Sequence, residues 1–170
     1  MRKLSLFVVG LVVASAPAMA GEIVWGGIEL GMSRSDVEAA YPKGGKTKYN
    51  SDESIEISDV RIIDKCQAEV NIYFEAGVVD RVKIAGNPSM AGRCSDTILS
   101  GLASKYGQPL GEDRSGGTLG SREGKVYIWT RPGGLTMRFK KYTNGAWGGG
   151  GLLKASWDLL YTSTGEDLAL

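Results

Sequence analysis

Two cysteines, Cys66 and Cys94, are the most reactive side chains in this 170-residue chain, which contains no histidine. The absence of histidine excludes Ser-His-Asp and Cys-His catalysis and every metal site that needs an imidazole. Redox pairs usually stand as Cys-x-x-Cys, and two thiolates without histidine make a poor zinc site. We therefore expect a structural disulfide between Cys66 and Cys94, maintained in an oxidising compartment. Redox or metal chemistry is the alternative.

Three further segments carry glycine or charge in patterns that suggest a site. Residues 120–125 (GSREGK) are similar to a phosphate loop, but three residues instead of four separate the glycines, and Val126 replaces the Ser/Thr that would hold magnesium. The glycine run 148–151 lacks the G-x-G-x-x-G spacing and predicts a loop. The acidic stretch 52–64 lacks calcium-loop spacing, so we expect a solvated edge. A glycosidase-like carboxylate pair stays open as an alternative, because its separation is a three-dimensional quantity. We predict no catalytic residue, no cofactor and no metal site.

Aromatic side chains are better suited to binding than to catalysis. Trp147 stands in a glycine-rich loop that cannot bury it locally, so it is either an anchor for a partner or a lid over the core. The segment around Tyr127 and Trp129 is apolar on both faces, so it is either a strand covered twice or a strand with one face docked on a partner. The candidate partner-binding residues are Trp147, Trp129, Tyr127 and Tyr142.

Two helices must help to position these residues. Ser33 is expected to cap the first, with Asp36 completing a short-armed capping box and Pro42 ending the helix. The second helix follows residues 87–89 and ends near Tyr106. Its apolar stripe is spaced at i, i+4, i+8 and i+12 and consists of Cys94, Ile98, Leu102 and Tyr106.

Alternation with a period of two predicts six strands. The first changes phase near residues 58–59, which indicates a bulge or a break. The next two, around Val70–Phe74 and 78–84, are joined by a tight turn at Ala76-Gly77. Three more cover 126–130, 135–142 and 152–161, while the polar segments 43–54 and 111–124 are expected to be loops.

The element order predicts an α+β fold, with a mainly antiparallel sheet and two helices packed on one face. With only two helices to cover it, the other face should stay partly open. We expect one domain over 21–170. The order also admits a tandem α-βββ pseudo-repeat with halves 28–86 and 87–162.

The first twenty residues predict export. Arg2-Lys3 precedes the apolar run 4–13, and Ala18-Met19-Ala20 supplies a cleavage pattern before Gly21. A membrane anchor is the alternative, but the run is short for a span. No other apolar run is long enough and no cysteine follows the cleavage site, so we expect no membrane span and no lipid anchor. Removal of the signal leaves one more acidic than basic residue, which argues against nucleic acid as a partner.

The segment Ile28–Glu38 (IELGMSRSDVE) resembles the G-M-[ST]-x-x-x-[VI] helix start of small outer-membrane-assembly lipoproteins. The same signature occurs in the wider group of folds similar to β-lactamase inhibitor proteins. The resemblance implies an exported, non-enzymatic protein that binds other proteins or supports envelope assembly. This chain departs from the lipoprotein branch because it lacks the lipid-bearing cysteine, and Tyr41-Pro42 replaces the usual Leu-Gly-x-Pro.

Three function classes follow from these observations. The leading hypothesis is a periplasmic or secreted envelope protein, not an enzyme, that binds or scaffolds another protein through a half-covered sheet and its loops. The second is an inhibitor or immunity protein that blocks a partner enzyme, using loops such as 143–151. The third is an exported hydrolase that uses carboxylates.

Overall fold

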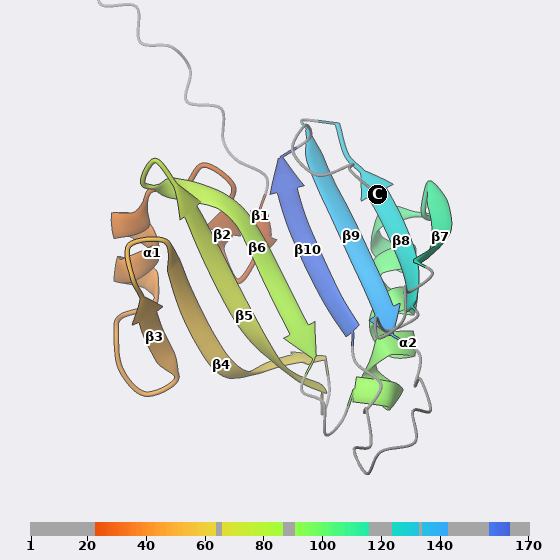
Figure 1. The fold of residues 1–170 in the computed structure, drawn as a ribbon, viewed down its shortest axis with the longest axis horizontal. Coiled ribbons are helices and arrows are strands. Elements are labelled where there is room, and N and C mark those ends of the chain that lie inside the picture. Colours follow the sequence, from red (N-terminus) through yellow and green to blue (C-terminus); the bar gives the residue numbers. More distant parts are fainter. Residues whose placement is uncertain are drawn as a thin grey trace, which may run out of the picture.

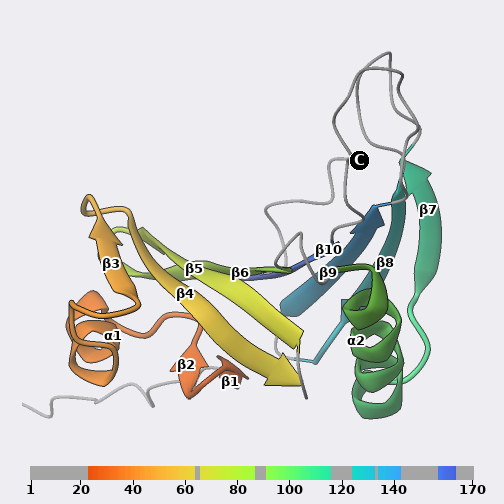
Figure 2. The ribbon, with the colours of Figure 1, turned by 90° about the horizontal axis from the view of Figure 1, so that it is seen from below.

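A large antiparallel sheet with two helices on one side makes up most of the structure, a computed structural model that describes residues 23–63, 66–86, 91–115, 124–132, 134–142 and 157–163 (Figures 1 and 2). The expected α+β class with a mainly antiparallel sheet is thereby confirmed. In chain order the elements are β1 (Ile23–Trp25), β2 (Ile28–Glu29), α1 (Arg34–Ala40), β3 (Thr47–Asn50), β4 (Ser54–Ile63), β5 (Cys66–Glu75), β6 (Val78–Gly86), α2 (Ala91–Tyr106), β7 (Gly111–Ser115), β8 (Gly124–Thr130), β9 (Leu135–Tyr142) and β10 (Trp157–Ser163). Among the described residues, neither helix is long and apolar enough to cross a membrane.

Eight of the strands form one sheet in the order β3-β4-β5-β6-β10-β9-β8-β7, while β1 and β2 pair separately. From β3 to β6, and again from β7 to β10, each strand pairs with the next one along the chain. The two runs meet where β6 pairs with β10, with Val82 opposite Tyr161 and Ile84 opposite Leu159. Figure 2 shows both helices and the β1–β2 pair on one side of the sheet, whose two ends rise toward the other side.

Helix α1 begins as its sequence predicts. The Oγ of Ser33 accepts a hydrogen bond from the backbone N–H of Asp36 at 3.2 Å and donates one to its carboxylate at 2.6 Å. Tyr41 caps the C-terminal end, directly before Pro42. Val37 is fully buried and fixes this helix to the core.

Helix α2 lies on the same side and presents its apolar stripe to the sheet. Cys94, Ile98 and Leu102 are buried, as the spacing predicts. The helix ends at Tyr106, where Gly107 takes a positive φ of 85° and donates its N–H to the carbonyl of Ala103. A positive φ of this kind is the usual end of a helix, and glycine adopts it without strain.

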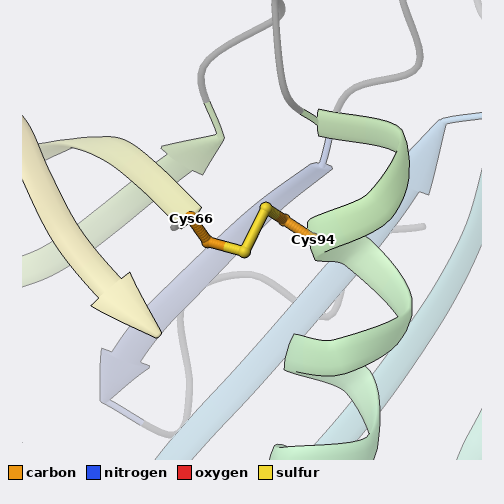
Figure 3. Close-up of a disulfide and its surroundings, with 2 residues drawn as sticks. All are labelled: Cys66 and Cys94. Atoms are coloured by element: carbon orange, nitrogen blue, oxygen red, sulfur yellow. A yellow bond between two sulfur atoms is a disulfide. The ribbon is translucent and has the colours of Figure 1, made fainter. Parts of the chain in front are cut away.

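The expected disulfide between Cys66 and Cys94 is present and joins the start of β5 to the first turns of α2 (Figure 3). The two Cα atoms are 5.7 Å apart. Both residues are buried, so the bridge is part of the core. It ties the second helix to a strand of the first run.

The bulge predicted in β4 is confirmed. Asp59 has a φ of 52°, and the register against β5 shifts between Ile57 and Val60. The tight turn between β5 and β6 is also where the sequence places it, with Ala76 and Gly77 both at positive φ. Both positions follow from local sequence alone.

The junction of the two runs depends on one close approach. Trp157 of β10 is 1 % exposed and stacks on Phe139 of β9, with 6.0 Å between ring centroids. Its indole lies directly against Gly86 of β6, where a Cβ atom would overlap the ring. Only a residue without a side chain allows the indole to pack here.

Two segments differ from the sequence-based expectation. The segments 43–54 and 111–124 were expected as loops, but they contain β3 and β7. Both are edge strands, held by backbone hydrogen bonds to a single neighbour, so neither shows the apolar alternation of a buried strand. The last strand is described from Trp157 to Ser163, and residues 152–156 of the expected strand lie outside the described part of the chain.

Candidate binding face of the sheet

The two faces of the sheet differ in what covers them. The helix side carries the core, including Val70, Ile72, Met137 and Phe139, which are all fully buried. Alternate side chains point to the opposite face. No helix lies on that face among the described residues (Figure 2). We refer to it as the open face.

Strand register places the side chains of the open face in transverse rows. Cross-strand neighbours in such a row have Cβ atoms about 4.5–5.5 Å apart. The central row, from β4 to β8, consists of Glu56, Asn71, Lys83, Leu160, Arg138 and Ile128. Lys83 and Arg138 therefore lie on either side of Leu160.

Two further cations border this row. Arg81 lies one step along β6, beside Tyr73, and its guanidinium carbon is 5.0 Å from the centre of the Tyr73 ring. Lys140 lies one step along β9 in the opposite direction, with its Nζ 5.1 Å from the centre of the Tyr142 ring. The four cations line a shallow hollow of about 320 Å³ over β6, β10 and β9. We call these four residues, Arg81, Lys83, Arg138 and Lys140, the cationic cluster.

One carboxylate, Asp158, lines the same hollow. It pairs across the strands with Lys140 and accepts a hydrogen bond of 2.7 Å from the hydroxyl of Tyr142. Tyr142, a candidate from the sequence, therefore lies on the open face at the border of the cationic cluster. Its ring supports Lys140 while its hydroxyl orients Asp158.

A second hollow of about 500 Å³ adjoins the first and has the opposite charge. Its lining includes Glu53, Glu75 and Asp80, with Arg81 between the two hollows. Asp80 and Arg81 form an ion pair of 3.7 Å. The open face thus changes from acidic to basic across a few residues.

The outer strands β3 and β4 carry polar pairs. Lys48 donates to Glu56 at 3.2 Å, and Asn50 donates to the other carboxylate oxygen. The hydrogen bond from Lys48, and after it that from Asn50, holds the pKa of Glu56 below its ordinary value. The negative charge of Glu56 is therefore already balanced by the ammonium of Lys48.

Two of the aromatic candidates do not lie on the open face. Trp129 is 2 % exposed and donates its indole N–H to the carbonyl of Gly107, which makes it a core residue that joins β8 to the end of α2. Tyr127 is half-buried and packs against Phe139 on the helix side. The helix side of this strand is covered, whereas half-buried Ile128 lies on the open face, so cover on both faces is not found among the described residues. Trp129 was expected at the surface, and the structure places it in the core instead. Burial follows from β8 lying between β7 and β9 beside α2.

Several expectations fall on residues that the structure does not describe. These are the signal peptide 1–20, the cleavage site before Gly21, and Trp147 with its whole loop 143–151. The cationic cluster, in contrast, was missed at the sequence level. The available signal was the alternation in 135–142, where Arg138 and Lys140 point away from the apolar face.

Comparisons with protein-family models, with curated proteins and with solved structures found no match to this chain. The described residues also contain no group of three or more cysteine, aspartate or glutamate side chains placed to hold a metal ion. The candidate site is therefore defined by the geometry of the open face.

Proposed function

We propose that this protein is an exported, non-catalytic module of the bacterial envelope that binds or scaffolds another protein through the open face of its sheet. The observation that carries the proposal is the one-sided cover of an eight-stranded sheet: both helices and the β1–β2 pair lie on one side (Figure 2). A sheet of this width offers a broad, rigid platform. Platforms built on strands position side chains more accurately than loops do.

Export is supported by the charged and apolar pattern of residues 1–20 and by the buried bridge between Cys66 and Cys94, since disulfides persist in oxidising compartments. The mature chain would begin at Gly21. Intact-mass analysis of the protein recovered from the periplasm or medium tests this, and a mass that includes Met1 would contradict it.

A binding role, rather than catalysis, is supported by the lack of histidine and of any recognisable nucleophile motif in the sequence. The resemblance of Ile28–Glu38 to the assembly lipoproteins and the group similar to β-lactamase inhibitor proteins supports the same role. So does the order of the chain, in which α1 precedes the run β3–β6 and α2 precedes the run β7–β10. We infer from this order that the domain is a pseudo-repeat of two halves, with the open face continuous across both.

Site-directed photo-crosslinking tests the proposal. A photoreactive residue at Glu69, which is exposed on the open face, should capture one protein species from envelope extract. The matched control is Ser104, which is exposed on α2 on the other side of the sheet. Equal capture at both positions, capture at Ser104 alone, or no capture at Glu69 would contradict a role for the open face.

A further inference from the structure

The cationic cluster gathers charge that the rest of the chain does not have in excess. Over the whole sequence, 20 basic residues balance 19 acidic ones. Around the hollow over β6, β10 and β9, four cations face one carboxylate, Asp158. The local potential is therefore positive although the protein as a whole is nearly neutral.

Among the described residues, Arg81 is the member of the cluster that forms an ion pair, with Asp80, and the other three cations form none. The Nε–H of Arg138 is buried and has no acceptor among the described residues. A buried donor without an acceptor is unfavourable, so the described residues leave part of the hydrogen-bonding capacity of this guanidinium unused.

Arg81 and Lys140 are already held in place. The Tyr73 ring supports Arg81, whose side chain is 46 % exposed, and the Tyr142 ring supports Lys140. Contacts between a cation and an aromatic face restrict the side chain, and Asp80 restricts Arg81 further through the ion pair with its Nε. Part of the ordering cost of binding is thus met before a ligand arrives.

Spacing indicates the shape of the ligand. Arg81 and Lys83 are two residues apart on one face of a strand, as are Arg138 and Lys140, a separation of about 6.6–6.8 Å along the strand. Carboxylates at alternate positions of an extended peptide have the same separation. Between the two pairs, the half-buried side chain of Leu160 offers an apolar contact.

The cluster is also bounded. Glu56 and Glu69 lie on the β4–β5 side of it, and Glu53, Glu75 and Asp80 line the adjoining hollow. A long uniform polyanion, such as a nucleic acid, would meet these carboxylates as soon as it left the cluster. A short acidic stretch would not, so the charges favour a protein partner.

We infer that the cationic cluster recognises an extended acidic segment of a protein partner, with carboxylates at alternate positions that bind Lys83 and Arg138 across Leu160. This inference rests on the proposed binding role of the open face and specifies the chemistry of the partner. Paired hydrogen bonds between the Arg138 guanidinium and a carboxylate would fix the orientation of the bound segment. Leu160 would contact an apolar side chain that lies between the acidic ones.

The probe is a labelled peptide of alternating glutamate and valine, compared with the same peptide carrying glutamine, in fluorescence anisotropy titrations at low salt. The glutamate peptide should bind at least about tenfold more tightly than the glutamine peptide. The double variant Lys83→Ala/Arg138→Ala should weaken its binding at least about tenfold, as expected for a cluster that dominates the contact. Lys48→Ala is the matched control on the same face, because it removes a lysine already paired with Glu56, and it should change binding less than about twofold.

Equal affinity for the two peptides, or equal loss in the Lys48 and Lys83/Arg138 variants, would overturn the inference. Tighter binding of a single-stranded oligonucleotide than of the glutamate peptide, with the same dependence on Lys83 and Arg138, would overturn it too. Circular dichroism of each variant separates lost binding from lost folding, and Arg138→Lys with Lys83→Arg should restore binding if charge is what matters. Crosslinking from Glu69 that persists while the acidic peptide fails to bind would reject this inference and leave the proposed function standing.

Discussion

Replacing Gly86 with alanine perturbs the close packing where the two runs of strands meet. A Cβ atom at Gly86 would overlap the indole of Trp157, which is 1 % exposed and stacked on Phe139. Gly86 itself does not have a positive φ, so the added methyl group acts through space alone. The indole must move or the strands must separate.

The size of the effect follows from what the indole buries. A tryptophan side chain buries roughly 150–250 Å², worth about 4–6 kcal/mol at about 25 cal/mol per Å². Overpacking of a filled core usually costs about 1–3 kcal/mol because neighbours relax. We expect Gly86→Ala to lower the free energy of unfolding by about 2–3 kcal/mol, a partial loss of the burial of Trp157.

Urea denaturation of the disulfide-intact protein measures this change. Gly101→Ala in α2 is the matched control, because a Cβ there would make an ordinary contact of 3.7 Å with Ile63. Alanine in place of an exposed helical glycine should raise stability by about 0.5–1 kcal/mol. Trp157→Leu, which removes the indole ring that lies against Gly86, should make Gly86→Ala less costly, with a coupling of at least about 1 kcal/mol. A Gly86→Ala protein as stable as the wild type, or additive effects in the double variant, would refute the close-approach argument.

Three further perturbations test other parts of the fold. Ser33→Ala should cost about 1 kcal/mol in urea denaturation because it removes the cap of α1, whereas Ser35→Ala should be nearly neutral, and the reverse order would contradict the observed cap. Thiol titration of unreduced, denatured protein should find no free thiol, and replacing both Cys66 and Cys94 with alanine should cost about 3–4 kcal/mol by the chain-entropy model; a loss below about 1 kcal/mol would show that the bridge matters little. The hydrogen bond from the ammonium of Lys48 lowers the pKa of Glu56 in the folded protein. The ionised Glu56 carboxylate therefore contributes stability above its unfolded-state pKa, and this contribution is lost as pH falls through its folded-state pKa. Carboxyl NMR titration should therefore give a midpoint below that of an unstructured glutamate, and a midpoint at or above it would contradict the pairing.

Much of this fold can be predicted from local sequence patterns. The cap at Ser33, the phase change near Asp59 and the turn at Ala76-Gly77 all follow from neighbouring residues, and the structure has each of them in place. Alternation also identifies which side of a strand is apolar, as in 135–142. These features are local because capping, positive φ and pleating depend on a few consecutive residues.

These local patterns do not predict edge strands, nor do they predict which buried side chains approach one another closely. Neither β3 nor β7 has an apolar face to reveal it, since an edge strand is defined by its one neighbour. Trp129 is a similar case, because a tryptophan in an apolar strand looks equally suited to a core and to an interface until α2 and the carbonyl of Gly107 are placed beside it.

The candidate site depends on the tertiary structure most of all. The sequence determined that Lys83 and Arg138 each point away from an apolar strand face, but it did not determine which strands are neighbours. Only the pairing of β6 with β10, and of β10 with β9, brings these two residues to either side of Leu160. Side-chain alternation is a property of one strand, whereas a binding surface needs residues from strands that are distant in the chain, and their order is set by the packing of the whole sheet on its helices.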